Sequence, residues 1–122
     1  MSIIEPTMIG LSEKTYAILN QMKEDNYLAE TADGYRLGIG LALAQGGRLL
    51  DVPSRRTVFS VATIDPDREI AAAIRALMDL QDGSVYRMAE KLAEWGVIEL
   101  ANRFDCGPID IASLLPSKLS NN

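Results

Sequence analysis

The segment from about Thr31 to Ala44 constrains the fold of this chain more than any other. From Leu37 onward it reads Leu-Gly-Ile-Gly-Leu-Ala-Leu-Ala, without one polar side chain. In a helix of 3.6 residues per turn, such a run is apolar on almost every side, and a helix of that kind has to be buried. We therefore expect neighbouring polypeptide to cover this helix, and a second copy of the chain is the partner that we expect.

Small residues recur along the same segment. Gly34, Gly38 and Ala42 follow one another at steps of four, and Gly40 is a further glycine inside the expected helix. Each internal glycine costs about 1 kcal/mol of helix propensity relative to alanine. The retention of these glycines indicates a compensating gain, which we expect to be close backbone contact with another helix.

A strand and a first helix are expected before this segment. The apolar run Thr7–Leu11 is typical of a short strand, and Ser12 followed by Glu13 is typical of a helix start. An amphipathic stretch then continues to Asn26. Gly46 and Gly47 are expected to end the second helix.

The second half of the chain repeats this order of elements. A strand is expected over Thr57–Thr63, and a helix is expected to start at Asp65 with Pro66 as its first residue. A fourth helix, capped by Ser84 and ended or kinked at Gly96, precedes a short continuation to Phe104. Its expected buried residues are Val85, Met88, Leu92 and Trp95.

These elements predict a mainly α protein with four helices and one or two short strands. We expect a strand-helix-helix dimerisation unit over residues 1–47, a linker over 48–56, a strand with a helical hairpin over 57–104, and an irregular tail over 105–122. The tail carries one apolar patch, made of Ile109, Ile111, Leu114 and Leu115.

A Tyr-Arg pair occurs near the start of each second helix, as Tyr35–Arg36 and as Tyr86–Arg87. One interpretation is an internal duplication, in which case the two strands would pair within one chain and mimic a dimer. The other is a chance likeness of two helical hairpins. Each pair could form a recognition point, but we expect the tyrosine to pack in the hairpin and Arg36 to pair with Glu30 or Asp33.

The element order over residues 7–46 resembles the ribbon-helix-helix fold. That resemblance implies that two copies pair their strands and interlock their helices, and that the paired strands read bases in the DNA major groove. The residues that the resemblance places at a dimer interface are Ile9, Leu11, Gly34, Gly38, Leu41 and Ala42.

The side chains that read bases are missing from the expected strand. Neither face of the run from Pro6 to Ser12 carries Arg, Lys, Asn or Gln. The net charge is -5, so DNA binding would depend on a local basic patch. The candidate DNA contacts are Thr7, Arg48, Arg55 and Arg56. The arginines could instead be solvated, or could pair with the acidic surface.

Several chemistries lack their usual residues. The chain has no histidine and a single cysteine, Cys106, so we expect no catalytic residue, no metal site, no cofactor and no enzymatic activity. The longest strongly apolar run, Leu37–Ala44, is far below the roughly 20 residues that span a bilayer. With no export signal visible at the N-terminus, we expect a cytoplasmic protein.

The sequence thus supports two hypotheses about function. The leading one is a small, dimeric, ribbon-helix-helix-like protein that acts in regulation or associates with duplex DNA. The alternative is a non-enzymatic assembly module that docks other protein subunits and does not bind DNA.

Overall fold

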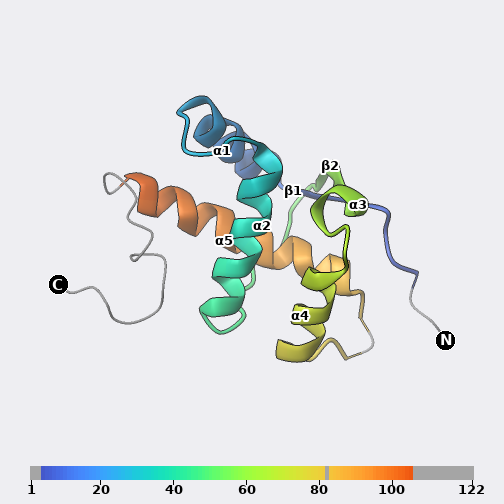
Figure 1. Cartoon of the computed structure of the whole chain (residues 1–122). Helices are drawn as coiled ribbons and strands as arrows, with labels where there is room; N and C mark the ends of the chain where they lie inside the picture. Colours follow the sequence, from blue (N-terminus) through green and yellow to red (C-terminus); the bar gives the residue numbers. More distant parts are fainter. Residues whose placement is uncertain (1–3, 82, 106–122) are drawn as a thin grey trace.

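The computed structural model describes residues 4–81 and 83–105. The chain is mainly helical with one two-stranded sheet, as the sequence predicts. The elements in order are β1 (Met8–Leu11), α1 (Glu13–Glu24), α2 (Thr31–Ala44), β2 (Arg56–Ser60), α3 (Val61–Ile64), α4 (Glu69–Leu77) and α5 (Val85–Asp105) (Figure 1). The expected apolar patch of the tail and Cys106 lie outside the described residues.

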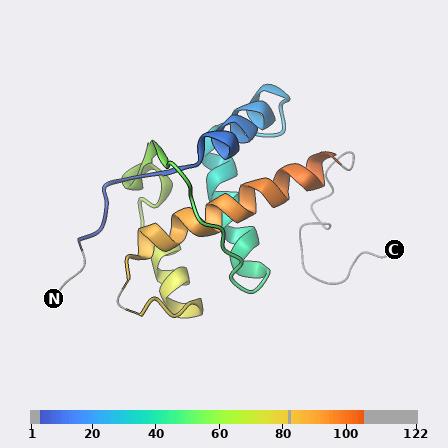
Figure 2. The same ribbon diagram turned by 180° about the vertical axis from the view of Figure 1, so that it is seen from behind.

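The helices α2 and α5 cross at the centre of the molecule, and both views show this crossing (Figures 1 and 2). The backbones touch where Gly38 of α2 meets Gly96 of α5. A Cβ atom built on Gly96 would lie 1.8 Å from the carbonyl oxygen of Gly38. The expected close contact of α2 with another helix is therefore confirmed, and the covering helix belongs to the same chain.

Gly96 does not end or kink its helix, contrary to the sequence-based expectation. Helix α5 continues without a break to Asp105. The glycine lies inside the helix because only a residue without a side chain fits against Gly38. Two of the expected core residues, Met88 and Trp95, are only half-buried. The most buried positions of the helix are Val85, Ala89, Leu92, Ala93, Val97 and Leu100.

The two strands pair with each other, antiparallel and within one chain. Met8 lies opposite Ser60 and Ile9 opposite Phe59, and the register shifts after Ile9. The second strand is shorter than expected, because residues from Val61 form the single turn α3. The Ser60 hydroxyl starts this turn by accepting a hydrogen bond from the Thr63 N–H.

Two helix starts can be compared with their predictions. The cap of α1 by Ser12 is confirmed, since its hydroxyl accepts a hydrogen bond from the Thr15 N–H. The predicted start of the third helix at Asp65 is wrong, because α4 begins at Glu69 after a turn in which Arg68 has a φ of 60°. The Asp65 carboxylate still caps α4, because it accepts hydrogen bonds from the N–H groups of Ile70 and Ala71.

The Tyr-Arg pairs have structural partners. Tyr35 is fully buried and donates a hydrogen bond to the Gly10 carbonyl oxygen, and Arg36 pairs with Asp33 at 2.8 Å. Burial, followed by the charges of Glu90 and Glu94, raises the pKa of Tyr35 well above its usual value. The phenol therefore remains a hydrogen-bond donor over the physiological range.

Two buried glutamates of α5 cover the edge of β1 that does not face β2. Glu90 accepts a hydrogen bond from the Gly10 N–H, and Glu94 accepts one from the Ser12 N–H, each at 3.0 Å. Both side chains are almost inaccessible, at 1% and 4% exposure. The Tyr35 hydroxyl donates to the Gly10 carbonyl oxygen at the same edge. Together, these hydrogen bonds use the backbone groups that a strand from a second copy would need for pairing.

In the part of the chain that the structure describes, no helix is both long enough and apolar enough to cross a bilayer.

Candidate functional site

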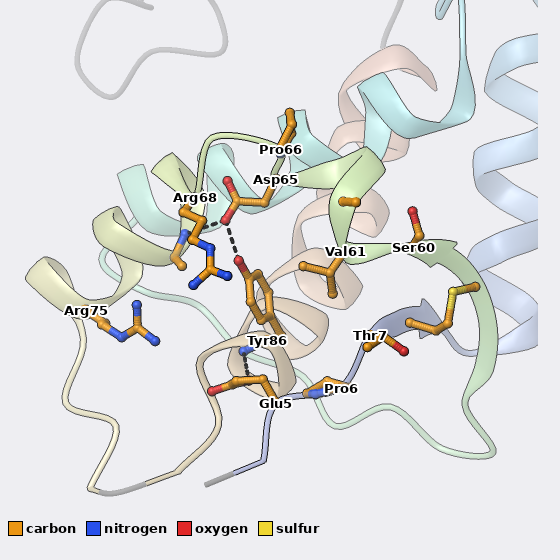
Figure 3. Close-up of a pocket in the computed structure, with 13 residues that line it drawn as sticks. Glu5, Pro6, Thr7, Ser60, Val61, Asp65, Pro66, Arg68, Arg75 and Tyr86 are labelled. Carbon is orange, nitrogen blue, oxygen red and sulfur yellow. Dashed lines mark hydrogen bonds between the residues drawn. The ribbon is translucent and has the colours of Figure 1, made fainter. Parts of the chain in front are cut away.

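A pocket of about 580 Å³ lies at one end of the β1–β2 ribbon. The segment that leads into β1 forms one wall, the junction of β2 and α3 forms another, and the start of α4 forms the third. Figure 3 shows Arg68 and Arg75 on one side of the Tyr86 ring, with Thr7 and Ser60 on the other. The pocket thus combines residues from four separate parts of the sequence.

Two carboxylates line this pocket, and fixed donors surround both of them. Asp65 accepts hydrogen bonds from two N–H groups at the start of α4 and from the Tyr86 hydroxyl at 2.8 Å. Glu5 accepts hydrogen bonds from the Ser84 hydroxyl and from the N–H groups of Val85 and Tyr86 at the start of α5. Each carboxylate is therefore already used as a helix cap.

Unlike these carboxylates, the guanidinium groups of the two pocket arginines have no hydrogen-bond partner among the described residues. Arg68 is the residue before α4, Ala71 and Arg75 lie four residues apart on that helix, and all three line the pocket. Among the described residues, neither guanidinium makes a hydrogen bond or an ion pair. The small side chain of Ala71 leaves space between them. The pocket therefore presents two cations whose donors are available to a ligand.

Tyr86 connects the two sides of the site. Its hydroxyl donates to Asp65, while its backbone N–H donates to Glu5. Burial first, and then the hydrogen bond and negative charge of Asp65, raise the pKa of Tyr86 to about 12. At neutral pH the phenol is therefore protonated and serves as a donor.

Replacing Glu5 by glutamine is expected to lower the free energy of unfolding more at pH 7 than at pH 3. Burial alone would raise the pKa of Glu5, but hydrogen bonds from Ser84, Val85 and Tyr86 and the charge of Arg75 outweigh it, so the pKa is lowered. A lowered pKa in the folded state contributes stability above the pKa of the unfolded state, and that stability is lost as the pH falls through the folded value.

Urea unfolding of the wild type and of Glu5→Gln at the two pH values measures this difference. Glu24→Gln, at an exposed residue at the end of α1, is the matched control. An equal loss of stability at pH 7 and pH 3 would contradict the assigned role of the carboxylate.

The structure spreads the four candidate DNA contacts over different surroundings. Thr7 is exposed at the pocket, and Arg48 is exposed after α2. Arg55 pairs with the buried Glu90 at 2.8 Å. Arg56 pairs with Glu13 at 3.0 Å, and its guanidinium lies 5.0 Å from the centre of the Tyr16 ring. Both adjacent arginines therefore have partners within the chain, and only the partner of Arg56 is an exposed carboxylate.

The six residues suggested for a dimer interface are all buried within the single chain. Ile9 and Leu11 have no exposed surface, and Leu41 and Ala42 are 6% and 0% exposed. Gly34 packs on the side chains of Leu19 and Leu28, and Gly38 packs on α5. The contacts that bury these six residues lie within one chain, so none of them is offered at the surface for a second copy.

Sequence reasoning did not single out Arg68 and Arg75. Their seven-residue spacing is compatible with one face of a helix, and this pattern could have drawn attention to them. In the sequence, Glu90 and Glu94 are simply two acidic residues of the expected fourth helix. They are four residues apart, so both lie on one face of α5. That face is buried because β1 packs against it, which the sequence does not reveal.

The fold and the pocket define a small, mainly helical protein with an intrachain β-ribbon and, at one end of that ribbon, a pocket lined by two carboxylates and two arginines. Comparisons with protein-family models, with curated proteins and with solved structures find no match. The described residues hold no group of three or more Cys, Asp or Glu side chains arranged for a metal ion.

Proposed function

We propose that this chain is a small, non-enzymatic assembly module that binds another protein through the pocket at the end of its β-ribbon. The observation that carries this proposal is the contrast between the two kinds of charge in that pocket. The carboxylates of Glu5 and Asp65 are surrounded by donors of the chain, whereas Arg68 and Arg75 make no ion pair with the described residues. We further propose that the protein acts in the cytoplasm.

The surroundings of the helix starts favour a protein partner over DNA. Backbone N–H groups at helix N-termini often bind phosphates. Here carboxylates of the chain already accept from N–H groups at the starts of α2, α4 and α5, through Asp33, Asp65 and Glu5. Arg55 and Arg56, the adjacent cations of the sequence, are engaged with Glu90 and Glu13.

Site-specific photocrosslinking tests this proposal. A photoreactive amino acid in place of Met8, which lines the pocket and is 43% exposed, should crosslink a partner protein in cells that express the chain. The double substitution Arg68→Gln and Arg75→Gln should reduce the yield of that product at least about fivefold. The control, Lys14→Gln with Arg48→Gln, removes the same charge from exposed residues outside the pocket.

Two results would refute the pocket as the docking site. One is the absence of any protein crosslink at Met8. The other is a crosslink whose yield is equal in the pocket variant and in the control variant.

A DNA-associated regulator is the second candidate. One observation favours it, namely the antiparallel ribbon that packs against the crossed helices within this single chain. The ribbon-helix-helix fold forms a similar arrangement from two chains. Fluorescence anisotropy with random duplex DNA at 50 and 200 mM salt would test it. Salt-sensitive binding that Arg48→Gln weakens would support this candidate, and no binding at the lower salt would refute it.

A homodimer remains a separate proposal, and it would need a surface other than the six residues that are buried within the chain. Leu37, on the outer side of α2, is 42% exposed and is the natural centre of such a surface. Sedimentation of the wild type and of Leu37→Gln would show whether a dimer forms and whether it depends on this residue.

A further inference from the structure

We infer that the pocket recognises a peptide segment in which one carboxylate is next to an apolar side chain, with Arg68 and Arg75 as the carboxylate receptors. This inference rests on the proposed function, since it names the partner chemistry of the same pocket. Three features of the pocket carry it: the charge it presents, the reach of its arginines and the apolar character of its walls.

The charge of the pocket fits a monoanion. The formal charges of Glu5, Asp65, Arg68 and Arg75 sum to zero, but each carboxylate lies at the N-terminus of a helix. A helix N-terminus is equivalent to roughly +0.5 elementary charge, so about half of each negative charge is offset. The remaining charge of about +1 matches one carboxylate, whereas a phosphate group carries about -1.5 to -2 at neutral pH.

The arginines can converge on one group. Arg68 lies in the turn before α4 and Arg75 lies in the last turn of that helix, and Figure 3 shows both on the same side of the Tyr86 ring. Their side chains are long and exposed, and both line the pocket. A carboxylate accepts bidentate hydrogen bonds from a guanidinium, so either arginine can hold it while the second adds charge. Thr7, on the opposite side of Tyr86, is also exposed at the pocket (Figure 3).

The walls of the pocket favour an apolar neighbour beside that carboxylate. The apolar lining residues are Pro6, Met8, Val61, Ala62, Pro66 and Ala71. A volume of about 580 Å³ is too large for a carboxylate alone and suits two or three side chains of an extended peptide. The site is therefore suited to a short acidic and apolar segment of a partner protein.

Binding of three fluorescein-labelled peptide libraries tests this inference. Each library has random positions around one fixed residue, which is glutamate, glutamine or phosphoserine. The full chain should bind the glutamate library best, and the selected peptides should have an apolar residue next to the glutamate. Arg68→Gln with Arg75→Gln should weaken binding of those peptides at least about tenfold, whereas Lys14→Gln with Arg48→Gln should change it less than about twofold.

Three outcomes would overturn the inference: tighter binding of the phosphoserine library, equal binding of the glutamate and glutamine libraries, or no binding below about 1 mM by any library. The photocrosslinking result distinguishes this failure from failure of the proposed function. If a crosslink at Met8 still depends on the two arginines, the docking function stands and only the chemistry of the ligand is wrong. Circular dichroism of both variants confirms that the comparison is made on folded protein.

Discussion

Replacing Gly96 by alanine is expected to destabilise the protein by about 3 kcal/mol or more, a large part of the 5–15 kcal/mol that stabilises a typical domain. The added Cβ would lie 1.8 Å from the carbonyl oxygen of Gly38 and 2.7 Å from its Cα atom. Both obstacles are backbone atoms of a buried helix, so no side chain can rotate away. The crossing of α2 and α5 would have to open, and the core between them would be lost.

Urea unfolding followed by circular dichroism at 222 nm measures this effect, and Gly40→Ala is its matched control. Gly40 also lies inside a helix, but a Cβ atom there meets nothing within 4 Å. Alanine should therefore stabilise the protein at this position, by up to about 1 kcal/mol, through helix propensity alone. A Gly96→Ala variant as stable as the wild type would show that the two helices do not cross as described.

Replacing Glu90 by glutamine is expected to cost about 3 kcal/mol, whereas the same change at Glu94 is expected to cost about 1 kcal/mol. The two side chains are one turn apart and equally inaccessible, but their partners differ. Glu90 is surrounded by groups that can only donate: the Gly10 N–H and the guanidinium groups of Arg55 and Arg87. In either orientation, the NH₂ group of a glutamine would face one of these donors.

Glu94 has more tolerant partners. One of its oxygens accepts from the Ser12 N–H, and the other accepts from the hydroxyls of Ser12 and Thr15 at 2.6 and 2.7 Å. Hydroxyl groups both donate and accept, so they can turn to accept from the NH₂ group of a glutamine. That change loses the extra strength of a charged acceptor but leaves no donor facing another donor.

Thermal and urea unfolding of both variants measures the difference, with Glu24→Gln as a control at an exposed site. Equal losses at positions 90 and 94 would contradict the argument from partner chemistry. Losses no larger than that of Glu24→Gln would show that neither carboxylate is held as described.

Local features of the sequence were enough to predict the main helices. Ser12 caps α1, α2 spans Thr31–Ala44 as expected, and Ser84 precedes α5. Helix caps and the periodicity of apolar residues depend on neighbours within a few positions, which is why they can be read from the sequence. The predictions failed where a distant contact overrides the local signal, as at Gly96, which packs on Gly38 instead of ending its helix.

The candidate site was less predictable than the fold. Thr7 does line the pocket, but Arg55 and Arg56 pair with residues of the same chain, and the arginines that line the pocket are instead Arg68 and Arg75. The capping of α5 by Glu5 joins residues about 80 positions apart. No local pattern contains that pairing, because the two groups meet only after the helices have packed.

The amino-acid sequence by itself determined that residues 31–44 form an apolar helix that must be covered on most sides, because the residues from Leu37 to Ala44 carry no polar side chain. Only the tertiary structure decided what covers it, namely α5 of the same chain at the Gly38–Gly96 contact. It also decided which charges are satisfied and which remain available, since a carboxylate or a guanidinium acquires its partner from the packing of distant elements. The hydrophobic effect has no direction and specifies burial but not the partner, whereas backbone contact and hydrogen bonds depend on three-dimensional position.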